Sequence, residues 1–439
     1  MNDHNIPFDN DLEEGQANDL RGFDVGEPDD ARPTEDEAPV EDLFPADDEY
    51  YDGTDGEYYD EADDEPLSEG DYTEVPRPKR KKKRSLTVRL LLLAGKGLLA
   101  LVLIAAILGG GLIGYLTVTE YYPAHAETAQ RGAVSVSQKL STHSLRLLTF
   151  NTGYGGLGED ADFFMDGGSG VNPEDEKTVT YNMMGIECIL EDADADVLLL
   201  QEVDSDSARS FNRNQWLQYE YDLEDYESRY ALNYSCKYVP YPITSPMGRM
   251  NSGVATFSRY DISSATRYSL PCPFTWPTRV ANLKRCLLVT RLPIANSEQE
   301  LVIINLHLEA YDDGEAKQAQ TEQLLSLMRE EYEKGNFVIA GGDFNQSFPD
   351  TTERYPLRDA DTYKPGQLDS LSGDWQYAYD EGTATCRLLD APYSADSQLY
   401  VIDGYIVSPN VQVDRVETLD EGFVYSDHNP VLLEVTLLP

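Results

Sequence analysis

The sequence predicts an α/β fold in which two mixed β-sheets pack face to face with helices on the outside. Three observations indicate this fold. Apolar and β-branched runs recur as strands in series, only two or three long amphipathic helices separate them, and polar residues follow several of the runs. A doubly wound parallel sheet would need a helix after nearly every strand, so the pattern disfavours that alternative.

The clearest single stretch is residues 336–348, NFVIAGGDFNQSF. Its first half is a compact apolar run typical of a buried strand, and two glycines close it, where the backbone can turn tightly. Asp343 and Asn345 then place a carboxylate and an amide at the end of the strand. Taken alone, this stretch could be an ordinary turn, but the same arrangement recurs elsewhere in the chain.

The other elements are predicted from the periodicity of apolar residues. Strands are expected at 145–151, 196–203, 253–259, 285–292, 300–308, 399–408 and in the segment that follows His428. Helices are expected at 174–191, 205–219 and 316–332. Residues 221–249, rich in Tyr and Pro, are expected to form a long loop.

Composition divides the chain of 439 residues into five segments. Residues 1–76 hold 29 Asp and Glu against two arginines, with few aliphatic residues, and are predicted to be a disordered acidic tail. Residues 77–96 are a basic juxtamembrane segment, and residues 97–119 run without a charge for long enough to cross a membrane as a helix. Residues 120–144 are expected to form a polar stalk, and residues 145–439 the folded domain.

The basic run KRKKKR lies shortly before the uncharged segment and orients the predicted membrane helix. In isolation the run could be a nuclear-localisation signal. Next to a hydrophobic span, the positive-inside rule places such a run in the cytoplasm. The tail is then expected in the cytoplasm and the C-terminal domain outside the cell. We therefore expect a single-pass protein of the cell membrane. The acidic tail could also recruit a basic cytoplasmic partner.

The cysteines and the charge balance restrict the possible functions. An odd number of cysteines cannot all pair in one chain, and Cys188, Cys236, Cys272, Cys286 and Cys386 form no CxxC or zinc-site spacing, although one disulfide is conceivable. From Glu120 onward there are 23 Lys and Arg against 51 Asp and Glu. Tight nonspecific nucleic-acid binding depends on basic residues, so this balance disfavours a processive nuclease without excluding a local basic groove.

Six polar positions share one property, which is that each lies at or beside an expected strand end. They are Asn151, Glu202, His307, Asp343 with Asn345, Asp403, and Asp427 with His428. Singly, each has an ordinary structural explanation, such as a solvated strand end or a core histidine. Together at one rim of the sheets they indicate a functional site, and two of the five histidines in the chain belong to the set.

The order of these motifs resembles the endonuclease/exonuclease/phosphatase superfamily, which includes deoxyribonuclease I, exonuclease III, bacterial sphingomyelinases and inositol-polyphosphate 5-phosphatases. The resemblance covers about residues 145–438. It rests on TFN at 149–151, QE at 201–202, NLH at 305–307, GGDFN at 341–345, IDGYIVS at 402–408 and SDHNP at 426–430. It implies a four-layer α/β sandwich and magnesium-dependent phosphoester hydrolysis by in-line attack of water.

The resemblance also implies a metal site. Glu202 would be the principal Mg²⁺ ligand, with Asn151 and Asp427 nearby, because Mg²⁺ prefers carboxylate and amide oxygens. Mn²⁺ or Ca²⁺ could take the same place. Some members carry an acid two residues after the first Asn, where this chain has Gly153, so a second metal ligand at that position is absent.

The remaining matched residues would act on the substrate. Asp343 and Asn345 would position and polarise the attacking water, and His307 would donate to a phosphoryl oxygen. Asp403 would orient His428, and the resemblance leaves open whether that histidine is the general base or acts on the phosphate.

Basic residues before the expected strand at 285–292 are candidates for contacting substrate phosphate. Arg279 and Arg285 are the two predicted substrate-binding residues, although both could equally be surface residues. The loop at 240–250 and the aromatic stretch CPFTWP at 272–277 are expected to shape a specificity pocket.

The predicted function is therefore a membrane-anchored, Mg²⁺-dependent phosphoester hydrolase. A tether at the bilayer raises the effective concentration of lipid headgroups, which favours a lipid or small-molecule phosphoester. An extracellular endonuclease is the alternative, with nucleic acid as substrate only. A second alternative is an inactive, membrane-anchored binding protein, which the presence of Glu202, Asp343 and His428 disfavours.

Overall fold

The structure is a computed structural model that describes residues 85–312, 314–359 and 362–438. Of the two units into which the chain divides, Met1–Lys82 and Lys83–Pro439, the described residues all belong to the second. The predicted acidic tail and the KRKKKR run lie outside the described residues.

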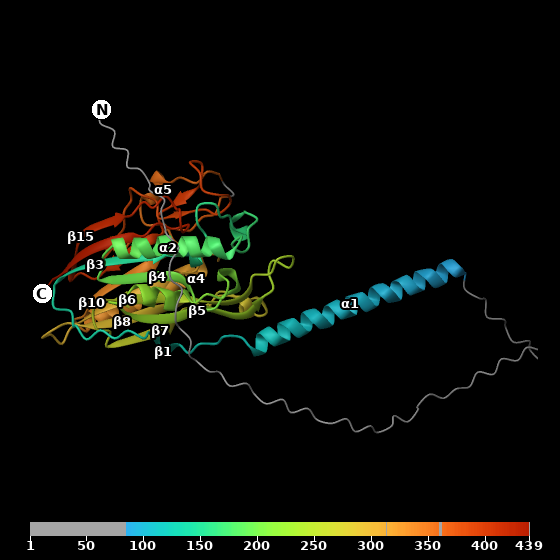
Figure 1. Ribbon diagram of the computed structural model, residues 1–439, viewed down its shortest axis with the longest axis horizontal. Coiled ribbons are helices and arrows are strands. Elements are labelled where there is room, and N and C mark those ends of the chain that lie inside the picture. Colours follow the sequence, from blue (N-terminus) through green and yellow to red (C-terminus); the bar gives the residue numbers. More distant parts are fainter. Residues whose placement is uncertain (1–84, 313, 360–361, 439) are drawn as a thin grey trace, which may run out of the picture. The chain divides into compact units, whose positions relative to one another are not determined.

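Two seven-stranded mixed sheets form the centre of this unit (Figure 1). One sheet, called sheet A, has the order β1 (Ala126–Thr128), β7 (Ser264–Ser269), β8 (Cys286–Pro293), β9 (Glu300–His307), β10 (Phe337–Asp343), β14 (Asp403–Val407) and β11 (Gln376–Ala378). The other, sheet B, has the order β15 (Val411–Thr418), β16 (Val431–Leu437), β3 (Ser144–Asn151), β4 (Val197–Asp204), β6 (Gly248–Ser258), β5 (Glu227–Val239) and β2 (Gln130–Arg131). A small separate ladder joins β12 (Cys386–Arg387) to β13 (Leu399–Tyr400).

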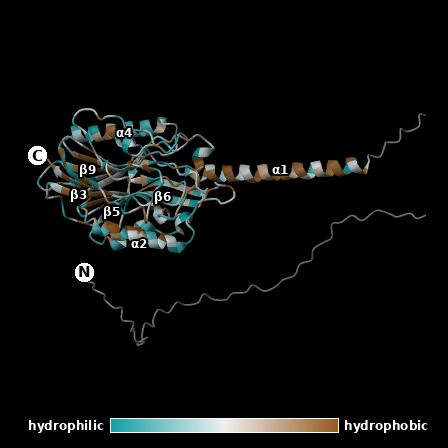
Figure 2. Ribbon diagram, turned by 90° about the horizontal axis from the view of Figure 1, so that it is seen from above, coloured by the Kyte–Doolittle hydropathy of each residue, from teal (hydrophilic) through white to brown (hydrophobic). Residues whose placement is uncertain are grey.

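Helices cover the outer face of each sheet, and Figure 2 shows α2 and α4 on opposite outer sides of the strands. Helices α2 (Glu176–Asp192) and α3 (Gln215–Asp222) pack on sheet B, and α4 (Glu315–Glu333) packs on sheet A. The short elements are α5 (Thr351–Arg354) and the 3₁₀ turns η1 (Gly153–Gly155), η2 (Phe164–Asp166), η3 (Ala208–Ser210) and η4 (Thr278–Ala281). The predicted four-layer α/β sandwich is confirmed.

Alternation of side chains along the strands produces these layers. In β4, Val197 and Leu199 contribute to the core between the sheets, whereas Leu198 and Leu200 pack in the cluster under α2. The apolar residues of β9 and β10 divide in the same way between the central core and the cluster under α4. Strands covered on both faces are continuously apolar in sequence, which explains why periodicity located them.

The predicted loop at 221–249 is wrong for most of its length, because it contains β5 and the start of β6. Many side chains that β5 buries are polar or aromatic. Arg229 Nη2 donates to Glu227 Oε1 at 2.6 Å, and Tyr230 stacks on Trp216 with ring centroids 4.9 Å apart. A strand that buries hydrogen-bonded polar groups lacks the apolar pattern that sequence reasoning uses.

Two other predicted elements are interrupted. The first half of the predicted helix at 205–219 is instead η3 and loop, because Ser207 Oγ donates to Asn251 O and accepts from Asn251 N, which ties this stretch to β6. The predicted strand at 399–408 is divided into β13 and β14. Ile402, which lies between the two strands, accepts a hydrogen bond from Phe344 N at 2.9 Å through its carbonyl oxygen.

Helix α1 (Leu86–Val118) begins earlier than the predicted Gly97. Among the described residues it is the one helix long and apolar enough to span a membrane, with a mean hydropathy of 2.6 in its most apolar window, none of which is buried. The expected stalk at 120–144 contains β1 and β2, which pair with β7 of sheet A and β5 of sheet B. The chain that follows α1 therefore joins both sheets before β3 begins.

All five cysteines lie in the described part of the chain and carry free thiols. The disulfide that the sequence left open is not formed. Burial raises the pKa of the Cys286 thiol to about 11 and that of the Cys386 thiol to about 12. These two thiols are therefore protonated and unreactive near neutral pH.

Strand directions bring the ends of several strands to one edge of the sandwich. β3 is parallel to β4, and β9 is parallel to β10, so the carboxyl ends of each pair meet. β14 and β16 run antiparallel to β10 and β3, so their first residues lie at the same edge. We call this the catalytic-end edge after the predicted site residues that it gathers, which are Asn151, Glu202, His307, Asp343 and Asp403.

Gly342 is expected to be essential for close packing of β10 against β9. An added Cβ would lie 2.0 Å from the Leu306 carbonyl oxygen, and the backbone φ of 152° disfavours other residues. Gly342→Ala should destabilise the fold by about 1–3 kcal/mol, as overpacking of a core does. Thermal unfolding of the detergent-solubilised full chain would measure this. Gly382→Ala is the control, since its Cβ would meet only the Asp380 carboxylate, and equal unfolding temperatures would contradict the prediction.

Candidate functional site

Asp343 lies at the centre of the candidate site. Its Oδ1 accepts a hydrogen bond from Asn345 N at 2.8 Å, and its Oδ2 accepts one from Asn151 Nδ2 at 3.1 Å. His307 Nε2 lies 3.4 Å from the same Oδ2. Because Asn151 ends β3 of sheet B and Asp343 ends β10 of sheet A, these contacts join the edges of the two sheets.

His428 lies among three carboxylates. Its Nδ1 is 2.8 Å from Asp403 Oδ2, and its Nε2 is 3.8 Å from Asp343 Oδ2 and 3.9 Å from Asp427 Oδ2. The position of Asp403 is itself fixed, because it pairs with Asp343 in the ladder and its N–H donates to Thr385 Oγ1 at 3.1 Å. The imidazole is thus oriented by one carboxylate, and its other nitrogen lies 3.4 Å from Asn151 Nδ2 and somewhat further from the two remaining carboxylates.

These surroundings push the pKa values of the two histidines apart. Burial alone would lower the pKa of His428, but the negative charge of Asp403 overcomes it and holds this pKa well above the ordinary value. Burial and the positive charge of Arg285 hold the pKa of His307 well below that value. Burial and the charge of Asp403 raise the pKa of Asp343 to about 6. At neutral pH, a cationic His428 therefore faces an ionised Asp343.

Glu202 lies in a bulge of β4. Its φ of 56° is in the left-handed region, and the register between β4 and β6 shifts between Leu200 and Val203. Bulges redirect side chains and recur next to functional sites. The side chain is 23% exposed, and Arg209 Nη2 lies 3.5 Å from its carboxylate.

The donor chemistry around Glu202 fits a hard divalent cation. Burial raises the pKa of Asp427 to about 7, with the charge of Glu202 adding to the effect and the charge of His428 opposing it. A divalent cation would relieve this repulsion between carboxylates. Asn151 could add its amide oxygen, which accepts one hydrogen bond, from Gly153 N at 3.1 Å.

A second group of possible metal donors consists of Asp343, Asp403 and His428, whose donor atoms lie within 4.8 Å of one another. This group is less suited to a metal. His428 is protonated at neutral pH and its Nδ1–H donates to Asp403, so the ring offers no lone pair. The trio fits proton transfer better than metal binding.

The structure brings most of the predicted site residues together and separates one. Asn151, Glu202, His307, Asp343, Asn345, Asp403, Asp427 and His428 lie at the catalytic-end edge. The predicted substrate contact Arg285 is buried just behind it, with Nη1 donating to His307 O at 3.3 Å. The other, Arg279, donates twice to Glu120, at 2.8 and 3.1 Å. Because Glu120 is not a site residue, these hydrogen bonds do not bring Arg279 to the site.

Sequence reasoning missed Arg209 and Asp204. Arg209 donates to both carboxylate oxygens of Asp204, at 3.1 and 3.0 Å, and its guanidinium lies 3.6 Å from the centre of the Tyr154 ring. Arg209 Nη2 of this buried pair also lies 3.5 Å from Glu202 Oε2, so the pair helps to hold the Glu202 carboxylate in position. The erroneous helix prediction at 205–219 concealed the pair, although the acid two residues after Glu202 was a usable signal.

Sequence reasoning also missed a polar rim around the site. The Tyr311 hydroxyl donates to Asp166 Oδ1 at 2.8 Å, and Lys317 Nζ donates to the Tyr363 hydroxyl at 3.2 Å. Burial lowers the pKa of Lys317, and nearby acids including Asp343 partly restore it. These residues come from loops and a helix start that carry no periodic signal.

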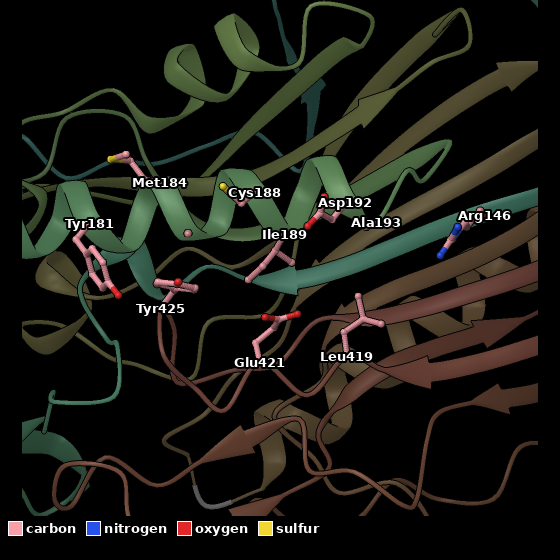
Figure 3. A pocket seen from close by; sticks show the side chains of 11 residues that line it. Arg146, Tyr181, Met184, Cys188, Ile189, Asp192, Ala193, Leu419, Glu421 and Tyr425 are labelled. Atoms are coloured by element: carbon pink, nitrogen blue, oxygen red, sulfur yellow. The ribbon is translucent and has the colours of Figure 1, made fainter. Parts of the chain in front are cut away.

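A cavity of about 440 Å³ lies between α2 and the loop before Asp427 (Figure 3). Its lining includes Tyr181, Met184, Cys188 and Tyr425, and none of the predicted site residues. It is therefore not the candidate site.

The raised pKa values of Asp343 and Asp427 make stability depend on pH. Both values, about 6 and about 7, exceed the 3.8 of an ordinary Asp, so the folded state binds more protons between about pH 4 and 7 and loses that advantage as pH rises. Without divalent metal, the double variant Asp343→Asn/Asp427→Asn should therefore gain stability relative to the wild type across this range. The gain should reach about 7 kcal/mol near neutral pH, at about 1.4 kcal/mol for each of the roughly five pKa units by which the two values together are raised.

Urea unfolding at several pH values in EDTA would measure this difference. Asp374→Asn, at an exposed position, is the matched control. A stability difference between the double variant and the wild type that does not change with pH would contradict the assignment.

The pKa of His428 should fall when its partner carboxylate is removed. In Asp403→Asn the imidazole loses the charge that holds its pKa high, while burial still lowers it. An NMR titration of ¹³C-labelled histidine would follow the change. His143, an exposed histidine, is the internal control, and an unchanged His428 titration would show that Asp403 is not the cause.

Comparison with known proteins adds a family match. The family model described as Endonuclease/Exonuclease/phosphatase family matches residues 179–428. A search of curated proteins found no match.

Solved structures with a similar arrangement come from several proteins. An endonuclease/exonuclease/phosphatase from Beutenbergia cavernae is 18% identical over 67% of this chain and 72% of that chain, with a TM-score of 0.47. ANGEL2, a 2′,3′-cyclic phosphatase, is 16% identical over 71% of this chain and 99% of that chain, with a TM-score of 0.47. TDP2 from Caenorhabditis elegans is 16% identical over 68% and 75% of the two chains, with a TM-score of 0.42.

The matched residues 179–428 make up more than half of the chain. They begin in α2 and end at His428, so they include every predicted site residue except Asn151. The chain belongs to the Endonuclease/Exonuclease/phosphatase family.

Proposed function

We propose that this protein is a membrane-anchored, metal-dependent phosphoester hydrolase. The family consists of phosphoester hydrolases, among them phosphodiesterases, nucleases and phosphatases. The observation that carries the proposal is the juxtaposition of ionised Asp343 with cationic His428, at the edge where the two sheets meet.

Asp343 is the proposed general base. Its carboxylate is ionised above a pH of about 6, and the Asn345 N–H and the Asn151 amide hold its two oxygens in place. A water beside Oδ2 would form a bond to phosphorus while the bond from phosphorus to the leaving oxygen breaks. The water proton would pass to Asp343.

The two histidines are proposed to stabilise the charge that develops on the phosphoryl oxygens. His428 Nε2–H, with Nδ1–H held by Asp403, would donate as a cation, and neutral His307 would donate through Nε2. The sequence left open whether His428 acts as base or on the phosphate, and the opposed pKa values support our proposal of His428 as donor and Asp343 as base.

Glu202 and Asp427, with the amide oxygen of Asn151, are the proposed ligands of a divalent cation. Mg²⁺ is the ion that such hard oxygen donors prefer, with Mn²⁺ or Ca²⁺ as alternatives. When bound, the ion would neutralise negative charge on the phosphoryl group. The ion pair with Arg209 would keep the Glu202 carboxylate oriented toward the cation.

A small or lipid phosphoester is favoured as substrate over a long nucleic acid. Basic side chains next to the site already have acidic partners, Arg209 with Asp204 and Arg285 with Glu309, and the region from residue 120 is strongly acidic. Few basic groups therefore remain for a run of backbone phosphates. We further propose that α1 is the membrane anchor, with the N-terminal tail in the cytoplasm and the catalytic domain outside the cell.

The test uses the full chain in nanodiscs, with Mg²⁺ or with EDTA. Substrates are sphingomyelin in the disc, bis(p-nitrophenyl) phosphate and plasmid DNA. We expect metal-dependent hydrolysis that falls by about 10²–10⁴-fold in Glu202→Ala and in His428→Ala. Matched controls are Glu298→Ala and His143→Ala, both at exposed positions.

Each outcome selects one account. Turnover of sphingomyelin or the small diester with little cleavage of DNA supports the proposal, and preferential DNA cleavage selects the endonuclease alternative. If no substrate is hydrolysed and Mg²⁺ does not bind, the inactive binding protein is the better account.

A further inference from the structure

The chain that leaves α1 enters the sandwich at the catalytic-end edge. β1 begins at Ala126, which pairs with Tyr268 near the end of β7. The end of β7 pairs with the start of β8, and Leu287 of β8 pairs with Leu306 of β9, the neighbour of His307. Residue 126 is thus at the same edge of sheet A as His307.

Specific contacts fasten the last turn of α1 to loops at this edge. Leu116 is 3% exposed and packs in a cluster with Tyr234, Cys236, Val239, Met250 and Val280. Trp276 Nε1 donates to Thr117 Oγ1 at 3.1 Å. Arg279 donates twice to Glu120, so two residues of the loop before β8 bind the end of the helix.

The connection between β5 and β6, residues 240–247, lies at the same edge. β4 and β5 are both antiparallel to β6, so both run toward this edge. β4 ends at Asp204, opposite Ser252, and β5 continues beyond it to Val239, opposite Gly248. Ile243 in this connection is 89% exposed and Tyr241 is 59% exposed. Trp276, at 57%, is also exposed although it binds the end of α1. We call Tyr241, Ile243 and Trp276 the apolar tip.

The apolar tip continues toward the rim of the site. The Phe164 ring lies 5.4 Å from the Tyr241 ring, and Phe164 also packs in the cluster that holds Leu116. Two residues further on, Asp166 accepts the hydrogen bond from Tyr311, which belongs to the rim. A series of contacts therefore connects the end of α1 with the rim of the candidate site.

We propose that the apolar tip is a membrane-contacting surface, which sits in the headgroup region of the bilayer that α1 crosses. Exposed Trp, Tyr and Ile beside the end of a membrane helix match the composition of that region, where aromatic side chains are enriched. The catalytic-end edge then faces the lipid headgroups, which makes a headgroup phosphoester of the same leaflet the substrate class. This inference rests on the proposed anchor and hydrolase function.

Membrane contact can be tested without catalysis. The full chain would be placed in phosphatidylcholine nanodiscs with and without bromine on the acyl chains, which quenches nearby tryptophan. We expect a loss of fluorescence that Trp276→Phe largely removes, and an added loss in Ile243→Trp. If neither position is quenched, the proposal is overturned, whatever the enzyme assays show.

The functional consequence is tested by Ile243→Asp. Hydrolysis of phosphoester lipid in the disc should fall about tenfold, the factor expected from removing one apolar side chain from the bilayer, while hydrolysis of bis(p-nitrophenyl) phosphate stays unchanged. Leu438→Asp, just after β16 at the opposite edge, is the matched control. An equal loss on both substrates would overturn the proposal.

A second copy of the chain is the competing occupant of the apolar tip. Unquenched tryptophan together with a change in oligomeric mass in Ile243→Asp would assign the surface to contacts between copies and overturn membrane contact. Absence of any turnover, with quenching intact, would refute the proposed hydrolase function but leave the membrane surface in place.

Discussion

A buried hydrogen-bond network between Gln201 and Asn305 holds the two sheets together beneath the site. Gln201 Nε2 donates to Asn305 Oδ1 at 2.9 Å, and Asn305 Nδ2 donates to two carbonyl groups of sheet B, at 3.2 and 2.8 Å. Both side chains are fully buried, so breaking these bonds would leave polar groups without water. Apolar contacts between the sheets would allow them to slide or rotate against each other, because the hydrophobic effect is not directional. Hydrogen bonds require defined distances and angles, so these bonds fix the relative position of the sheets. Since Glu202 follows Gln201 and His307 lies two residues after Asn305, the network sets how the two halves of the site meet.

Once the edges meet, burial divides the chemistry among similar groups. Two histidines with the same intrinsic proton affinity acquire opposed pKa shifts. The charge of Asp403 outweighs burial and raises the pKa of His428, whereas burial and the charge of Arg285 both lower the pKa of His307. Asp343 is buried beside Asp403 and therefore ionises at a higher pH than an ordinary carboxyl group. One fold can support many functions, so we propose that these residues carry the chemistry and that the surrounding loops select the substrate.

The position of the proposed anchor gives one indication of that selection. The chain from α1 joins sheet A at the catalytic-end edge, and Trp276 and Arg279 bind the end of the helix there. Had it entered at the opposite edge, the site would point away from the proposed bilayer. Topology thus links the proposed location of the protein to the class of phosphoester within its reach.

The α/β class, the apolar helix, the central strands and most of the candidate site could be predicted from the sequence. Strands buried on both faces are continuously apolar, and GGDFN and SDHNP place polar groups directly beside them. The sequence did not reveal β5, whose buried side chains are largely polar or aromatic and break the apolar pattern of a strand, or Arg209, whose role depends on Asp204 and Tyr154. The opposed pKa shifts of the two histidines and the pairing of Arg279 with Glu120 emerge only in the folded chain. Both depend on which charges lie within a few ångströms after folding, and local periodicity does not encode those distances.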